Sequence, residues 1–230
     1  MKPHVTLSTH VIVAIDGPSG VGKGTVAREV AARLCCRHVD TGAMYRALAW
    51  RAEHLGVSLD DEDAVVAVAT AAAIRVDGSA VEIDGVDVSR AIRTPEIDRA
   101  TTRVARLPRV RALLVTRQRA LVSQGSVVME GRDIGTVVFP EADVKIFLDA
   151  SAEQRARRRA SDPAHSSRDT QALADIAQAM QRRDENDRTR QASPLVAAPD
   201  AIVIDTTNIE ASQVVDRVMD IIRQRAPLSR

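Results

Sequence analysis

Continuous apolar runs alternate along this chain with segments in which apolar residues recur every three or four positions. The first run, Val11 to Ile15, has the character of a strand that is buried on both faces of a parallel sheet. Val26, Val30 and Leu34 follow at four-residue spacing and predict an amphipathic helix. Similar patterns predict strands at 126–129, 144–148 and 201–204, and helices at 108–122, about 170–190 and 209–223. This alternation predicts an α/β fold with a mostly parallel central sheet between helices.

One region breaks the alternation. Residues 74–89 read IRVDGSAVEIDGVDVS, in which Asp77-Gly78 and Asp84-Gly85 favour tight turns between short strands. A helical pattern precedes this region, and Thr94-Pro95 begins another helix after it. The sequence therefore predicts a core domain of residues 11–59 and 101–230, with a small inserted domain of antiparallel strands at residues 60–100.

Composition excludes several classes of partner. The chain carries 32 basic and 31 acidic side chains, a net charge of +1, so no global field attracts it to nucleic acid or to anionic lipid. Its aromatic content of 2% is too small for a base-stacking platform. No apolar run approaches the roughly twenty residues that cross a bilayer. We expect neither nucleic acid nor a membrane as a partner.

The two cysteines, Cys35 and Cys36, are adjacent, and two thiols are too few for a disulfide framework or a zinc cage. The first apolar run leads into a glycine loop and not into a small-residue cleavage site. Both observations favour a reducing compartment. We expect the protein to be cytoplasmic.

A glycine-rich loop, GPSGVGKGT, follows the first predicted strand and matches the phosphate-binding pattern of glycine, four residues, glycine and lysine. Such a loop surrounds a polyphosphate with backbone N–H groups and a helix N-terminus, and its lysine reaches the terminal phosphates. Gly24 follows the lysine, so the hydroxyl that usually faces magnesium arrives one position later, at Thr25. We expect the phosphates of a nucleotide to bind Gly17, Pro18, Ser19, Gly20, Val21, Gly22, Lys23, Gly24 and Thr25, and Mg²⁺ to lie near Thr25, directly or through water; the family resemblance described below implies that this nucleotide is ATP.

Charged residues cluster at two places that the strand pattern brings to the same sheet edge. Residues 130–136, EGRDIGT, follow the strand at 126–129, and ligands bind beyond the carboxyl ends of parallel strands. This position favours a ligand-binding role for the charges over a simple turn. Residues 40–46, DTGAMYR, open a helix; taken alone, Thr41 and Arg46 also fit a helix cap and a solvated surface charge.

Arginines crowd two further segments. Arg155, Arg157, Arg158 and Arg159 outnumber the nearby acids, which favours a polyanionic ligand over mutual neutralisation. Residues 182–190, RRDENDRTR, mix arginines with acids. Arg183 and Asp187 are four positions apart there, so a self-satisfied salt-bridge face fits this segment equally well.

Six motifs, in order along nearly the whole chain, resemble those of bacterial-type cytidylate kinases. They are IDGPSGVGKGT (15–25), DTGAMYR (40–46), LPRVR (107–111), GRDIGTVVFP (131–140), KIFLDAS (145–151) and RRDENDRTRQASPL (182–195). The resemblance implies a P-loop three-layer fold, an inserted monophosphate-binding domain and an Arg-rich lid at about residues 157–169. It implies transfer of the γ-phosphoryl group of ATP to CMP or dCMP, with Mg²⁺, giving ADP and CDP or dCDP.

The resemblance also assigns residues to roles. It places Arg46, Arg132 and Arg190 around the monophosphate, Thr41, Arg183 and Asp187 at the sugar, and Thr102, Arg111 and Asp133 at the cytosine. Charge stabilisation during transfer falls to Lys23, Arg132, Arg158 and Arg159. Position 102 departs from the family by carrying threonine where serine is familiar, which keeps the hydroxyl and adds a methyl group.

The chemistry of cytosine supports this choice of substrate. Its exocyclic amine suits a carboxylate such as Asp133 and its ring acceptors suit a guanidinium such as Arg111, whereas uracil reverses the donor and acceptor.

The alternatives are a P-loop kinase for UMP, AMP or shikimate, a nucleotide-dependent switch, and a scaffold without catalysis. The chain has no Asn-Lys-x-Asp guanine signature, and intact Lys23 and Thr25 disfavour a scaffold. We expect a monomer.

Overall fold

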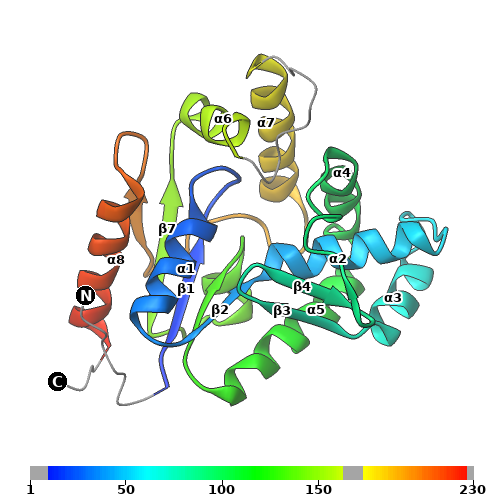
Figure 1. Ribbon diagram of the computed structural model, residues 1–230, viewed down its shortest axis with the longest axis horizontal. Coiled ribbons are helices and arrows are strands. Elements are labelled where there is room, and N and C mark those ends of the chain that lie inside the picture. The colour runs from blue at the N-terminus through cyan, green and yellow to red at the C-terminus, as the bar shows by residue number, and fades with distance from the viewer. Residues whose placement is uncertain (1–9, 163–172, 227–230) are drawn as a thin grey trace.

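The computed structural model describes residues 10–162 and 173–226 and shows three layers (Figure 1). Within these residues, five parallel strands form the central sheet in the order β2-β6-β1-β7-β8. They are β1 (Ile12–Asp16), β2 (Arg37–Asp40), β6 (Val127–Glu130), β7 (Val144–Asp149) and β8 (Ile202–Asp205). Helices α1 (Lys23–Arg33) and α8 (Ala211–Arg225) cover one face of the sheet. Helix α5 (Pro108–Ala120) and a π-helical segment (Ile134–Val138) cover the other, so the predicted fold class is confirmed.

The apolar runs of the sequence form the strands at the centre of the sheet. Strand β1 pairs with β6 on one side and with β7 on the other, and the helical layers cover both of its faces, so Val13 to Asp16 are buried. Strand β2 lies at the edge and pairs only with β6 in the central sheet. The sequence does not signal this strand, because its residues, RHVD, contain a single apolar side chain.

The inserted region carries the antiparallel sheet that its turn signals predict. Helix α3 (Glu62–Ala71) precedes strands β3 (Ile74–Asp77), β4 (Ala80–Ile83) and β5 (Val86–Asp87), and helix α4 (Pro95–Val104) follows them. The side chains of Val81 and Ile83 pack against α2 (Thr41–His54). The small sheet is thereby held against the helix that begins at Thr41, beside the carboxyl end of β2.

Two helices lie beyond the carboxyl ends of the strands, next to the glycine-rich loop (Figure 1). They are α6 (Ala152–Ala160) and α7 (Leu173–Thr189). Of the predicted lid, residues 157–162 belong to α6 and the turn after it, and residues 163–169 lie outside the described residues. No helix in the described ranges has both the length and the apolar character that a bilayer requires.

Gly17 lies in a position that excludes any side chain. Its φ is +145°, and a Cβ atom would stand 2.1 Å from the carbonyl oxygen of Leu148 in the neighbouring strand β7. We expect Gly17→Ala to lower the free energy of unfolding by about 3 kcal/mol, because backbone must move to relieve the overlap. Urea unfolding measures the loss.

Gly56→Ala is the matched control, because Gly56 also has a positive φ, +67°. Among the described residues, however, no atom beyond its chain neighbours lies within 4 Å of the place that a Cβ at Gly56 would take. Conformational strain alone is expected to make that loss about 1 kcal/mol. Equal losses in the two variants would contradict the steric explanation.

Candidate functional site

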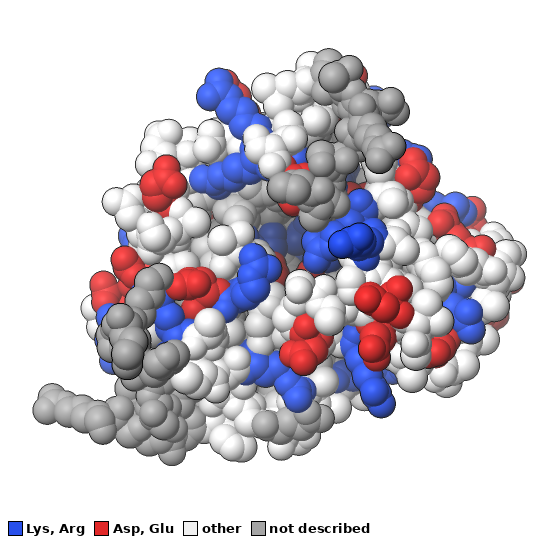
Figure 2. Space-filling model, in the orientation of Figure 1, with Lys and Arg blue, Asp and Glu red and all other residues white. Residues whose placement is uncertain are grey.

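A cavity of about 1430 Å³ lies at the carboxyl ends of the strands, between the glycine-rich loop, the inserted domain and helices α6 and α7. Blue Lys and Arg side chains gather around a hollow near the middle of the face shown in Figure 2. The guanidinium groups on the cavity lining are those of Arg28, Arg46, Arg90, Arg93, Arg111, Arg132, Arg158, Arg159, Arg183 and Arg190. A pocket with this lining attracts a polyanion.

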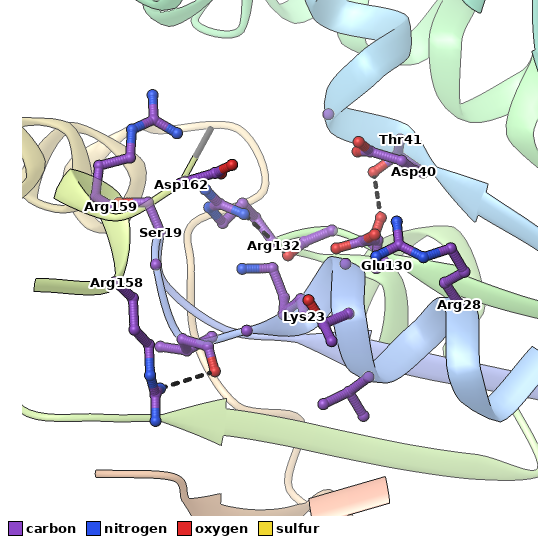
Figure 3. Close-up of a pocket in the computed structure, with 18 of the residues that line it drawn as sticks. Ser19, Lys23, Arg28, Asp40, Thr41, Glu130, Arg132, Arg158, Arg159 and Asp162 are labelled. Carbon is purple, nitrogen blue, oxygen red and sulfur yellow. Dashed lines mark hydrogen bonds between the residues drawn. The ribbon is translucent and has the colours of Figure 1, made fainter. Parts of the chain in front are cut away.

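The glycine-rich loop forms one wall of the cavity (Figure 3). Residues 19–25 line it, whereas Gly17 and Pro18 lie behind the wall and accept hydrogen bonds from Lys23 Nζ at 2.7 and 2.6 Å. Burial, and then the positive charge of Arg132, lower the pKa of Lys23 to about 7. Anionic phosphates bound at this wall would raise the pKa of Lys23 again, because negative charge stabilises the ammonium group. The exposed Thr25 lies at the first turn of α1, on the same lining.

The DTGAMYR segment meets the end of β6 at a second wall. Asp40 caps α2 by accepting a hydrogen bond from the Ala43 amide at 3.0 Å, and it accepts another from Arg46 at 2.7 Å. The Thr41 hydroxyl donates to the carbonyl oxygen of Glu130 at 2.7 Å (Figure 3). Asp40 is therefore the helix cap, and Thr41 ties α2 to the strand end.

Arg111 and Asp133 form a buried ion pair at another part of the lining, with side chains only 4% and 8% exposed. The Arg111 guanidinium also lies 5.3 Å from the centre of the Tyr45 ring. Four buried donor groups of cavity-lining residues have no hydrogen-bond partner among the described residues: Arg46 Nε, the Tyr45 hydroxyl, Arg111 Nε and Arg190 Nη2. Since buried polar groups are rarely left unpaired, a polar ligand suits this part of the cavity.

Asp187 binds two of the arginines that the sequence predicts at the site, Arg132 and Arg190. Its carboxylate accepts hydrogen bonds from Arg132 Nε at 3.0 Å and from Arg190 Nη1 at 3.3 Å. Burial alone would raise the pKa of Asp187, but the charges of Arg132, Arg183 and Arg190 outweigh it and lower the pKa. Arg183 does not follow the predicted salt-bridge face: its guanidinium donates to Asp98 on α4. The sequence also allows an ion pair between Asp187 and Arg190 from their three-residue spacing, and this pair is present. Because Arg183, Asp187 and Arg190 all line the cavity, the segment is nevertheless not a solvated surface face.

The four crowded arginines of α6 divide into two groups. Arg158 and Arg159 line the cavity, and Arg158 donates to the Thr206 hydroxyl at 2.9 Å. Arg155 is instead buried against Asp184, and Arg157 pairs with Glu153 on the surface. The hypothesis that all four arginines serve a polyanionic ligand is therefore wrong for Arg155 and Arg157, because both pair with acids and lie outside the cavity lining.

The structure separates Thr102 from the cavity. Its hydroxyl donates to the carbonyl oxygen of Asp98 at 3.1 Å, and the neighbouring Thr101 lines the cavity in its place. Adjacent residues of a helix point about 100° apart, so only one of the two can face the pocket in this arrangement. Thr101, and not Thr102, is therefore the threonine of α4 on the cavity lining.

Glu130, which the sequence places at the ligand-binding edge without a specific role, is the last residue of β6, and its Oε1 lies 2.9 Å from His38 Nε2 in a buried pair. Other lining residues carry no role in the sequence prediction. Tyr45 belongs to the DTGAMYR motif, which could have drawn attention to it. Arg90 and Arg93 come from the inserted domain and give no signal in the sequence beyond their charge.

Residues 13–224 match the family described as cytidylate kinase. The chain belongs to the cytidylate kinase family. It is 44% identical over 216 residues to a cytidylate kinase of Desulfitobacterium hafniense, covering 93% of each chain. It is 45% identical over 233 residues to that of Mycobacterium avium, covering 97% of this chain and all of the relative. The protein is thus an ATP-dependent nucleoside monophosphate kinase.

Solved structures with little sequence identity share the fold. A gluconokinase from Sinorhizobium meliloti superposes with a TM-score of 0.51 at 12% identity, covering 95% of this chain and 94% of its own. A shikimate kinase from Bacteroides thetaiotaomicron gives a TM-score of 0.50 at 10% identity, covering 93% and 98%. At these identities the likenesses show the fold alone.

Asp16 is the last residue of β1 and lies beneath the cavity. Its ionisation should make the free energy of unfolding depend on pH. Its carboxylate accepts hydrogen bonds from the amides of Ile134 and Gly135 at 2.9 and 2.7 Å. Burial outweighs these bonds and raises the pKa from 3.8 to about 6. The folded state therefore binds this proton more tightly than the unfolded chain does, and Asp16 makes the protein less stable as the pH rises from about 4 to about 6.

Asp16→Asn should remove this dependence. Between about pH 4 and pH 7, the difference in unfolding free energy between variant and wild type should move in favour of the variant by up to about 3 kcal/mol. Urea unfolding at the two pH values, without nucleotide, measures it. A difference that does not change with pH would contradict the assignment.

Proposed function

We propose that this cavity binds ATP and CMP, or dCMP, end to end and transfers the γ-phosphoryl group between them, giving ADP and CDP or dCDP. The observation that carries the proposal is the arrangement of the lining. The glycine-rich loop forms one wall and the Arg111–Asp133 pair another, with Arg132 and Lys23 on the same lining. Such an arrangement suits two anionic ligands, one of which carries a base with both donors and acceptors.

In this mechanism an oxygen of the CMP phosphate attacks the γ-phosphorus of ATP. The bond between the γ-phosphorus and the β,γ-bridging oxygen breaks at the same time, and that oxygen leaves with ADP. The attacking phosphate is already an anion at neutral pH, so the reaction requires no strong base. The side chains of Lys23, Arg132, Arg158 and Arg159 stabilise the charge that spreads over the transferring group. Arg46 and Arg190 hold the acceptor phosphate, and Arg183 and Asp187 face the sugar.

The residues present also fit a bound Mg²⁺. This ion usually keeps several waters and is held by phosphates with one or two protein oxygens. Thr25 and the carboxylate of Glu130 offer such oxygens on the cavity lining. The Glu130 carboxylate lies beside the first turn of α1, because its Oε1 is only 3.3 Å from the place that a Cβ atom at Gly24 would take. When bound, Mg²⁺ would neutralise charge on the β- and γ-phosphates of ATP.

Base selection rests on Arg111 and Asp133. We propose that the Asp133 carboxylate accepts a hydrogen bond from the cytosine amine and that Arg111 donates to the ring, with Thr101 and Tyr45 completing the surroundings. Uracil offers an acceptor where cytosine offers its amine, so it would leave Asp133 without a donor. A buried unpaired group costs about 1–3 kcal/mol, which corresponds to a preference for CMP over UMP of roughly tenfold to a hundredfold.

The formation of ADP from Mg-ATP with CMP, dCMP, UMP, AMP or GMP offered in parallel tests the function. CMP and dCMP should give the highest kcat/KM. Highest activity on AMP or GMP would favour another small-molecule kinase, and slow ATP hydrolysis that no acceptor accelerates would favour a nucleotide-dependent switch.

We further propose that the protein acts as a monomer in the cytoplasm. The glycine-rich loop, the strand ends, the inserted region and helices α6 and α7 of one chain together line the cavity. Cys35 and Cys36, both within the described residues, form no disulfide, as expected in a reducing compartment. Light scattering on the purified protein, with and without nucleotide, measures the oligomeric state.

A further inference from the structure

Asp98 connects the inserted domain to the two helices on the other side of the cavity mouth. It lies in the first turn of α4, and its Oδ1 accepts a hydrogen bond from Arg183 Nη1 of α7 at 2.9 Å. Its Oδ2 accepts a second hydrogen bond, from Arg159 Nη2 of α6. The side chains of Asp98, Arg183 and Arg159 are 14%, 19% and 26% exposed, so water screens these contacts only in part.

The two arginines belong to the site, whereas Asp98 does not. Both Arg159 and Arg183 line the cavity, and Asp98 lies outside its lining. The proposed reaction uses the arginines for the charge of the transferring group and for the acceptor nucleotide, and it gives Asp98 no part. A carboxylate nevertheless presents two oxygens to guanidinium groups much as a phosphate does.

The charges around Arg159 indicate what this carboxylate does. Burial lowers the pKa of Arg159, and the nearby positive charges of Arg183 and Arg46 lower it further. Asp98, and to a lesser extent Asp162, oppose these effects. In the absence of an anionic ligand, Asp98 therefore offsets part of the repulsion among the cavity arginines.

We propose that Asp98 is an internal counter-anion that holds Arg159 and Arg183 at the edge of the cavity and competes with bound nucleotide for them. The inference rests on the proposed function, which directs these arginines to the substrates. A guanidinium N–H that donates to Asp98 is not available to a phosphate or a sugar oxygen, so binding must weaken at least one of the two contacts. Asp98 is a positioning residue and contacts no reacting atom.

Asp98→Asn tests the competition, because it keeps the size of the side chain and removes the charge. We expect the variant to bind CMP about three- to tenfold more tightly, which corresponds to the loss of one partly exposed ion pair. Calorimetric titration of CMP gives the Kd directly. The melting temperature without nucleotide should fall, and the increase that CMP produces should become larger. If Asp98 only holds α4 against α6 and α7, the melting temperature should fall, but CMP should not bind more tightly.

Asp60→Asn is the matched control. Asp60 also receives a hydrogen bond from an arginine of α4, Arg103, at 2.7 Å, but its side chain is 79% exposed and outside the cavity lining. Both substitutions remove one negative charge close to α4. The Kd of CMP for Asp60→Asn should stay within about twofold of the wild-type value, since exposed charges are well screened.

Equal or weaker CMP binding by Asp98→Asn would overturn the inference while leaving the proposed function intact. A wild-type protein that binds no CMP would overturn the proposed function, and this inference with it. The wild type also allows a test that does not depend on the folding of a variant. In a crystal structure with bound CMP and an ATP analogue, the Asp98 carboxylate should have lost Arg159, Arg183 or both; retention of both contacts would overturn the inference.

Discussion

Replacing Lys23 with methionine is expected to lower kcat by about 10³-fold, a loss typical for the removal of one preorganised charge from a transition state. Lys23 is a buried residue of the cavity lining, and its ammonium group donates to the carbonyl oxygens of Gly17 and Pro18. Phosphates on this wall would offer it a stronger, anionic acceptor. Steady-state rates of ADP formation with saturating CMP measure the effect.

Methionine has nearly the same length as lysine and no charge, so the fold should tolerate it. Because burial already lowers the pKa of Lys23, the variant should be at least as stable as the wild type in the absence of nucleotide. CMP binding by calorimetry serves as the internal control and should change by less than about threefold, since the acceptor site does not include Lys23. A variant that retains more than a tenth of the wild-type kcat would show that Lys23 is not needed for transfer.

Asp133→Asn is expected to lower kcat/KM for CMP by about 10²-fold and that for UMP by much less. Asparagine can present an N–H group where the carboxylate presents only acceptors, and that group repels the cytosine amine but suits the carbonyl of uracil. The ratio of kcat/KM for CMP to that for UMP, measured in one enzyme preparation, reports the base preference. It does not depend on the fraction of folded protein.

This ratio matters because the substitution also disturbs a buried ion pair. Asp133 and Arg111 are both buried, and removal of one partner leaves the other charge uncompensated, so the variant should be less stable than the wild type. ATP binding, measured by calorimetry, should be nearly unchanged. Losses of equal size for CMP, UMP and ATP would show that Asp133 supports the fold and does not select the base.

Much of the fold follows from features that are local in the sequence. The strand that ends at Asp16, the glycine-rich loop and α1 are contiguous, and their apolar spacing and glycines are sufficient to identify them. The turns of the inserted sheet were equally predictable, because Gly78 and Gly85 have the positive φ values that Asp-Gly turns favour. Residues 134–138, IGTVV, form a π-helical segment that the sequence does not reveal, since its β-branched composition is typical of a strand.

The site was predictable where residues follow a strand or belong to one motif, and less so where distant helices meet. Arg132 and Asp133 come directly after β6, and the strand-end rule places them at the cavity. Arg155 carries no local sign that it would pair with Asp184, which lies on a different helix. The choice between Thr101 and Thr102 depends on the rotation of α4, and a motif does not fix a rotation.

A crystal structure with CMP and a non-hydrolysable ATP analogue would show whether one arginine-lined cavity brings two nucleotides together end to end. We expect the triphosphate on the loop of residues 17–25 and the cytosine beside Arg111 and Asp133. The CMP phosphate should lie in line with the γ-phosphate, which Lys23 and Arg132 contact. A cytosine bound away from Arg111 and Asp133, or a CMP phosphate that does not face the triphosphate, would contradict the proposed function.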